Sequence, residues 1–178
     1  TTFGVMKKCI SLITIVLLLA CSDGDLQIEA IDFDSVAVQS CETPVATAQN
    51  VLFKINQDEA LIMTLQSGVL NNGVIGTDTI ETTSTVPGQT QLLYRIFSGS
   101  VTTSYFCSDF PPVEPLVTDE IEAQDGAVII NTVMNADTTA FVHTIRLSGI
   151  TLVNSQGERI TDLTINDFGE VSTVINQN

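Results

Sequence analysis

The sequence predicts an all-β fold, specifically an antiparallel β-sandwich of the immunoglobulin-like or a similar type. Short runs rich in Thr, Val and Ile follow one another, separated by turn residues about every 8–12 positions. In addition, no window of about 11–18 residues carries the apolar stripe of an amphipathic helix. Because no helical segments lie between the strands, antiparallel pairing is favoured over a βαβ arrangement.

The length of 178 residues and the hydrophobic content of 44% support one domain with its own core, expected over residues 28–178. The hydrophobic content also excludes a chain that is disordered throughout. The expected strands cover residues 27–33, 51–56, 61–66, 91–97, 101–107, 127–134, 140–147, 150–153, 159–165 and 170–175.

One expected strand alternates clearly in polarity. Val51, Phe53 and Ile55 should share one face of residues 51–56, with Lys54 on the other face. Such alternation is typical of a strand whose two faces meet different surroundings.

The connections between strands carry their own signals. Residues 98–100 predict a β-hairpin that joins strands 91–97 and 101–107. Residues 78–91 are polar and rich in Thr, which predicts either a long loop or an exposed edge strand. Three prolines within residues 110–115 exclude a central strand, since each lacks a backbone N–H, and predict an extended crossover.

The first twenty residues indicate an export signal. Met6 and two lysines are followed by an apolar run that extends to Ala20. This run is too short to span a membrane, which takes about 20 apolar residues, and it matches the apolar region of a secretory signal. Residues 6–20 are therefore expected to form a signal peptide, with residues 1–5 belonging to an over-long reading frame.

The end of this run, Leu18-Leu19-Ala20-Cys21, resembles the lipobox of bacterial lipoproteins. The resemblance implies cleavage before Cys21 and a lipid on its thiol, which makes the membrane a partner and residues 21–27 a short acidic tether. The alternatives are an ordinary signal cleaved nearby and a Leu-rich core strand. Cleavage would remove two lysines and no acid, and so leave four basic against 21 acidic residues, a net charge of −17.

The residues after the lipobox, Ser22-Asp23-Gly24-Asp25, resemble sorting signals of Gram-negative lipoproteins. A serine after the lipidated cysteine implies the outer membrane, and the acidic pattern implies display on the cell surface in Bacteroidota. A polar tether without sorting information is the alternative. The expected location is the cell surface of the outer membrane, with the periplasmic face as the alternative.

Two of the four cysteines remain after processing, because Cys9 would leave with the signal and Cys21 would carry the lipid. An even pair in an oxidising compartment predicts a disulfide between Cys41 and Cys107, which closes a loop of about 66 residues. Two free buried thiols are the alternative. Two sulfurs and one histidine without paired spacing do not predict a metal site.

The net charge of −15, with only six Lys and Arg, excludes nucleic acid as a partner. Sugar recognition usually relies on aromatic side chains. Trp is absent, and Tyr94 and Tyr105 are the only tyrosines, so a glycan ligand is not favoured. The expected ligand is a protein or glycan of unknown identity.

His143 is the single histidine, and it should share a strand face with Phe141, Ile145 and Leu147. A catalytic base or a metal ligand is one interpretation of this residue. A half-buried strand histidine bonded to a neighbour is favoured, because no partner motif accompanies it. The sequence therefore predicts no catalytic residue.

Two groups of acids offer oxygen ligands for Ca²⁺: Asp32 and Asp34, and Asp119, Glu120 and Glu122. No twelve-residue loop with the required Asp, Gly and Glu spacing is present. Solvated acidic surface is the favoured interpretation, so no cofactor is expected and calcium is the alternative.

Three tripeptides resemble the O-glycosylation sequon of exported Bacteroidota proteins: Asp34-Ser35-Val36, Asp78-Thr79-Ile80 and Asp137-Thr138-Thr139. The resemblance implies a glycan on the central residue of each, namely Ser35, Thr79 and Thr138. Chance occurrence in a Thr-rich chain is the alternative.

Several stretches together resemble small uncharacterised lipoproteins of flavobacteria: residues 23–25, 52–56, 94–97, 106–112 and 143–145. The resemblance covers most of the mature chain and carries no assigned activity. It implies an envelope location and a Cys41–Cys107 link, and it adds no catalytic residue.

These observations predict a lipid-anchored, non-enzymatic protein of the cell envelope that acts as a binding or envelope-associated module. One alternative is an accessory subunit of an outer-membrane complex on the periplasmic face, which would carry an apolar surface patch. The other is a hydrolase that uses His143, which would place this side chain in a concave pocket beside a hydrogen-bonded partner.

Overall fold

The computed structural model describes residues 31–73, 76–110, 112–157, 159–160 and 166–175. Antiparallel strands dominate these ranges, and their one helix, α2 (Thr103–Cys107), has 5 residues. No helix of the described ranges is long and apolar enough to cross a membrane. The expected signal peptide, Cys21 and the tether lie outside the described residues.

All strands of the described chain belong to one antiparallel sheet. Its order is β1-β2-β4-β5-β6-β7, with β3 paired to β5 and β8 paired to β6. The all-β, antiparallel prediction is therefore confirmed. The strands are β1 (Asn50–Asn56), β2 (Glu59–Leu65), β3 (Thr79–Thr85), β4 (Thr90–Phe97), β5 (Val117–Met134), β6 (Ala140–Val153), β7 (Arg159–Ile160) and β8 (Asp167–Val174).

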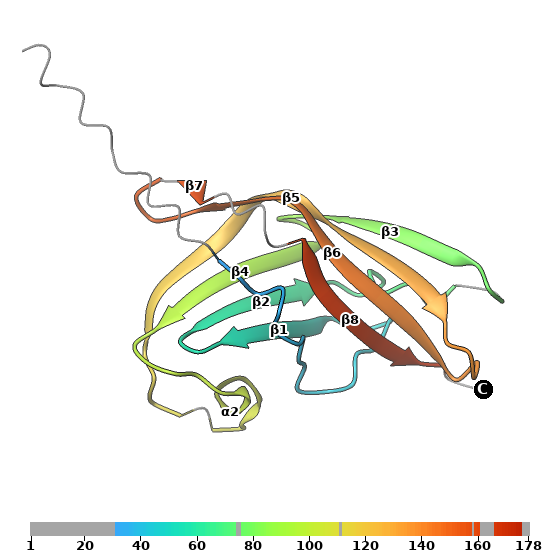
Figure 1. Cartoon of the computed structure of the whole chain (residues 1–178), viewed down its shortest axis with the longest axis horizontal. Helices are drawn as coiled ribbons and strands as arrows, with labels where there is room; N and C mark the ends of the chain where they lie inside the picture. The colour runs from blue at the N-terminus through green and yellow to red at the C-terminus, as the bar shows by residue number, and fades with distance from the viewer. Residues whose placement is uncertain (1–30, 74–75, 111, 158, 161–165, 176–178) are drawn as a thin grey trace, which may run out of the picture.

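The sheet curls so that its two halves share one core (Figure 1). β1, β2, β4 and the first part of β5 form one half, and β3, the rest of β5, β6 and β8 form the other. The hydrogen bonds do not divide the strands into the two sheets of the expected sandwich, because β5 runs through both halves and joins them.

β5 bends near Gly126. Its pairing with β6 shifts in register between Ala123 and Asp125, and again between Asp125 and Ala127. Gly126 has a φ of +128°, and a Cβ at this position would stand 2.9 Å from the Cα of Ile150. Only glycine fits such a conformation and such a close approach. The loop between β3 and β4 lies at the same bend, since the Val86 N–H donates to the Gly126 carbonyl.

Most of the expected strands are confirmed, and two of them are fused into one. β1, β2, β4 and β8 correspond to the expected ranges 51–56, 61–66, 91–97 and 170–175. The exposed edge strand β3 lies within residues 78–91, and the expected strand 127–134 is the end of β5. β6 contains both of the expected strands 140–147 and 150–153. Only residues 159–160 of the expected strand 159–165 are described. Residues 31–33 are not in a strand, and residues 27–30 lie outside the described chain.

The predicted hairpin of residues 91–97 and 101–107 is wrong, because residues 103–107 form α2. The ring centroids of Tyr105 and Phe106 lie 5.0 and 6.4 Å from that of Phe97. Neighbouring residues of a strand point to opposite faces, so a strand would bring only one of the two rings to Phe97. The short helix allows both to pack there.

Residues 31–39 fill the gap between the edge strands β1 and β8. The Nζ of Lys54 in β1 donates to the carbonyls of Phe33, at 2.7 Å, and Asp167 in β8, at 3.1 Å. Gln39 and Phe53 exchange two backbone hydrogen bonds of 2.8 Å each. This segment therefore joins both edges of the curled sheet.

Lys54 lies on the opposite face from Phe53, as the alternation predicted, but that face belongs to the main core, where Leu52 is also buried. Both faces of β1 are covered, since the rings of Phe53 and Phe106 stack with centroids 4.5 Å apart. Burial lowers the pKa of the Lys54 ammonium, and the carboxylate of Asp167 is the largest opposing influence.

Candidate functional site

The chain leaves the edge of β1 after Gln39 and returns to it only at Asn50. The structure contains the Cys41–Cys107 disulfide, with the two Cα atoms 5.2 Å apart. This bond holds the departing chain next to α2. Residues 40–49 form the resulting loop, called here the edge loop.

The side chain of Asn50 holds the far end of the edge loop. Its Oδ1 accepts from the Val45 N–H at 2.7 Å, and its Nδ2 donates to the carbonyls of Val45 and Ala48, each at 2.9 Å. Asn50 is only 7% exposed, so these bonds are sheltered from water. The edge loop is thus fixed by a covalent bond at one end and by these three hydrogen bonds at the other. The Gly68 N–H and the Ser67 hydroxyl also donate to the carbonyls of Ala46 and Thr47.

A cavity of about 390 Å³ lies between the edge loop, β1 and α2. Its size is within the range of pockets that hold small molecules. Most of its wall is apolar, with contributions from Val45, Ala48, Phe53 and Phe106, whereas Glu42 is the only ionisable residue among the described lining residues. This wall suits an uncharged ligand or a ligand side chain.

A second cavity, of about 290 Å³, lies across residues 43–47 from the first. Asn72 and Thr173 contribute its polar wall and connect it to the buried histidine. The Thr173 hydroxyl donates to the Asn72 Oδ1 at 2.8 Å, so its oxygen accepts from the Nε2–H of His143, also at 2.8 Å. The Nδ1 of His143 then accepts from the Thr132 hydroxyl at 2.8 Å.

His143 is therefore a neutral, fully bonded histidine between two threonines. Its side chain is 0% exposed, and burial lowers its pKa to about 4. The prediction that it shares a face with Phe141, Ile145 and Leu147 is confirmed, because all three are buried with it. The expected half-exposure is wrong, since β5 and β8 cover the ring from both sides.

The hydrolase hypothesis required His143 to line a concave pocket. Instead, Thr173 separates the imidazole from the second cavity. Both ring nitrogens already have hydroxyl partners, so neither is directed at a site where a substrate would bind. Neither of the two cavities described above is lined by His143.

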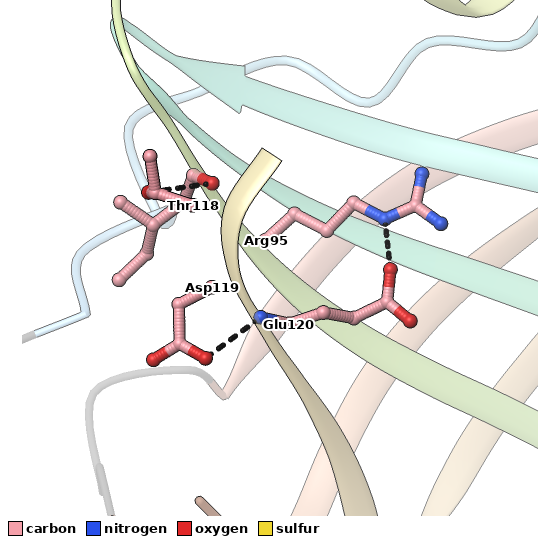
Figure 2. Close-up of polar contacts among 5 residues, drawn as sticks. Arg95, Thr118, Asp119 and Glu120 are labelled. Atoms are coloured by element: carbon pink, nitrogen blue, oxygen red, sulfur yellow. Dashed lines mark hydrogen bonds and ion pairs between the residues drawn. The ribbon is translucent and has the colours of Figure 1, made fainter. Parts of the chain in front are cut away.

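The acids at the start of β5 do not converge on one point. Figure 2 shows Glu120 paired with Arg95, whose Nε lies 2.6 Å from Glu120 Oε2, while the Asp119 carboxylate accepts from the Glu120 N–H. The nearby Thr118 hydroxyl donates to the Ile96 carbonyl. Successive residues of a strand point to opposite faces, which keeps the Asp119 and Glu120 carboxylates apart.

The other acidic pair, Asp32 and Asp34, lies beside Lys54. The Asp34 N–H donates to Asp32 Oδ1 at 3.2 Å, and both carboxylates favour the charged form of the Lys54 ammonium. Among the described residues, no three His, Cys, Asp or Glu side chains are grouped so as to hold a metal ion.

The three candidate glycosylation residues are all exposed. Ser35 lies in the turn that follows Phe33, Thr79 begins β3, and Thr138 lies in the turn between β5 and β6. Exposure is a requirement for a glycan, so their modification stays a prediction.

An exposed apolar loop follows the disulfide. Phe110 and Val113 are 90% and 85% exposed, and Leu116 and Val117 are also exposed. The loop is held at its far end by Ser98, whose N–H donates to the Leu116 carbonyl and whose Oγ accepts from the Leu116 N–H. We call residues 109–110 and 112–116, which precede β5, the apolar loop.

Sequence reasoning missed the cavity and the residues that shape it. Asn50 preceded a predicted strand with no recognisable signal, and Phe106 was assigned to a strand. The cysteine pairing was the one available indication, because it predicted that residues near Cys41 and Cys107 lie together.

Comparisons with protein-family models, with curated proteins and with solved structures found no match.

Proposed function

We propose that this chain is a lipid-anchored, non-enzymatic binding module of the bacterial outer membrane, displayed on the cell surface. In this proposal, Cys21 carries the lipid, and the curled sheet serves as a sandwich-like scaffold for the edge loop. The flavobacterial resemblance of the sequence supports the envelope location.

The observation that carries the binding role is the cavity of about 390 Å³ beside β1. It is mostly apolar, it is partly open to solvent, and its walls are held by the Cys41–Cys107 disulfide and by Asn50. A site whose walls are already in place loses little conformational entropy when a ligand binds.

The anchoring is tested by metabolic labelling with an alkyne-bearing fatty acid. We expect the wild-type chain to incorporate the label, Cys21→Ser to lose it and Cys9→Ser to keep it. Protease treatment of intact cells then distinguishes the faces of the membrane: loss of a C-terminal tag indicates surface display. A label that persists in Cys21→Ser would contradict the proposal.

A second candidate is an accessory subunit on the periplasmic face of an outer-membrane complex. The apolar loop favours it, because Phe110 and Val113 expose large apolar side chains to solvent. Protection of the tag on intact cells, together with a specific cross-link from position 110 to a membrane protein, would favour this candidate over surface display.

A further inference from the structure

We infer that the cavity beside β1 binds a secondary amide, such as a peptide bond or an N-acetyl group. The amide pairs with the backbone of Val51, and its apolar substituent contacts Val45, Phe53 and Phe106. This inference rests on the proposed binding function and specifies the chemical class of its ligand.

The backbone groups of Val51 point to the outer edge of β1. Gln39 bonds to both the N–H and the C=O of Phe53, so these two groups point to the outer edge of the sheet. Alternate residues of an antiparallel strand direct their N–H and C=O to the same edge. Val51, two positions earlier, therefore directs its N–H and C=O to this outer edge, away from β2.

The outer edge of β1 is paired at Phe53 but not at Val51 within the described residues. Continuing the register of Gln39 opposite Phe53 would place Cys41 opposite Val51. The disulfide holds Cys41 next to Cys107 instead, and the pairing ends after a single bridge. Within the described part of the chain, no group hydrogen-bonds to Val51 from the outer edge.

The backbone of Val51 and the apolar wall of the cavity together suit one class of ligand. A secondary amide supplies one donor and one acceptor, which are the two groups that Gln39 supplies to Phe53. The stacked rings of Phe53 and Phe106, with centroids 4.5 Å apart, offer an apolar surface beside Val51. The exposed carboxylate of Glu42 and the net charge of −15 disfavour an anion.

The test compares N-benzylacetamide with benzyl acetate, which has nearly the same shape but lacks the amide N–H. Both are titrated against the mature chain in lipid nanodiscs by saturation-transfer NMR, with empty nanodiscs as the blank. We expect the ester to bind roughly five-fold more weakly, since it cannot donate to the Val51 carbonyl.

Ala48→Phe places a large side chain in the wall of the cavity and is expected to weaken binding of N-benzylacetamide about ten-fold. Ala136→Phe, at an exposed turn position outside the cavity, is the matched control and should bind as the wild type does. The comparison of amide with ester needs no substitution, so it tests the inference even where Ala48→Phe fails to fold.

Two further probes identify the source of the amide. Tighter binding of acetyl-Leu-Val amide indicates a peptide, and tighter binding of N-acetylglucosamine indicates a glycan. Equal affinities for amide and ester, binding unchanged by Ala48→Phe, or no binding of any amide would overturn the inference. Fatty-acid labelling of Cys21 is independent of these results, so a failure here is distinguishable from a failure of the proposed anchoring.

Discussion

Residues 31–39 and the edge loop are adjacent in the chain and meet the same edge of β1, yet they are stabilised in different ways. In the first segment, Ile31 and Phe33 are completely buried, and its backbone bonds to Lys54 and to β1. The edge loop is held by one disulfide, by Asn50, and by hydrogen bonds from the Gly68 N–H and the Ser67 hydroxyl to the carbonyls of Ala46 and Thr47. Burial therefore stabilises the closed part of this edge, whereas a cross-link and hydrogen bonds stabilise the part that keeps a cavity.

The largest expected effect comes from removing the cross-link. In Cys41→Ser/Cys107→Ser, the unfolded chain gains the freedom of a loop of 66 residues, so the free energy of unfolding should fall by about 4 kcal/mol. Urea denaturation measures this change, and the wild type in reducing agent should match the double variant. A loss below about 1 kcal/mol would show that the edge loop is held mainly by non-covalent contacts.

A slightly smaller loss of stability is expected on lowering the pH, because this protonates the buried His143. The pKa of His143 is lowered to about 4 in the folded chain, against 6.5 in the unfolded chain. Its contribution to stability is therefore complete above pH 6.5 and falls as the pH drops toward 4, by roughly 3 kcal/mol in total.

The measurement is urea denaturation of the wild type and of His143→Gln at pH 7.5 and pH 4.5. The two proteins share all their other ionisable groups, so the difference between the two pH dependences isolates the histidine. An identical pH dependence in the two proteins would mean that the ring is accessible to protons in the folded state.

An intermediate effect is expected from Lys54, the buried lysine of β1 that bonds to residues 31–39. Lys54→Met removes the donor to the Phe33 and Asp167 carbonyls and should cost about 2 kcal/mol of unfolding free energy, because both acceptors lose a partner. Arg95→Met is the matched control: its ion pair with Glu120 is solvent-exposed, and its loss should cost less than about 0.5 kcal/mol. Similar costs for the two variants would contradict the role of Lys54 in closing this edge.

The smallest expected effect tests the non-covalent end of the edge loop. Asn50→Ala removes three hydrogen bonds to Val45 and Ala48 and should cost about 1 kcal/mol, together with a measurable loss of amide binding. Asn135→Ala is the control, because Asn135 holds the turn between β5 and β6 in a similar way, through Thr139 and Ala140. It should lose similar stability without any change in binding.

Local pattern predicted those parts of the fold where neighbouring residues decide the structure. The alternation of residues 51–56 and the apolar run at 91–97 were sufficient to locate β1 and β4. α2 was missed, because its two adjacent aromatic rings gain from packing on one partner, Phe97, which a local pattern does not include. The first part of β5 was missed because its residues, rich in acids, pair with β4 and expose one face to water.

The candidate site was less predictable than the fold. The cysteine count predicted which two cysteines are joined, but it carried no information on the direction in which the backbone of Val51 points. The role of Lys54 depends on the carbonyls of Phe33 and Asp167, which lie far away in the sequence. The sequence placed His143 among apolar residues, whereas its partners Thr132 and Thr173 come from two other strands.

The sequence by itself determined most of the strand content, the antiparallel class, the disulfide partners and the excess of acidic residues, because each depends on composition or on short-range periodicity. Tertiary structure alone decided that the strands form one curled sheet, that His143 is neutral and enclosed, and that a cavity opens beside Val51. These features arise where β5 bends at Gly126 and where a cross-link holds the chain off an edge strand. In both cases the outcome depends on contacts between residues far apart in the chain, which local pattern does not encode.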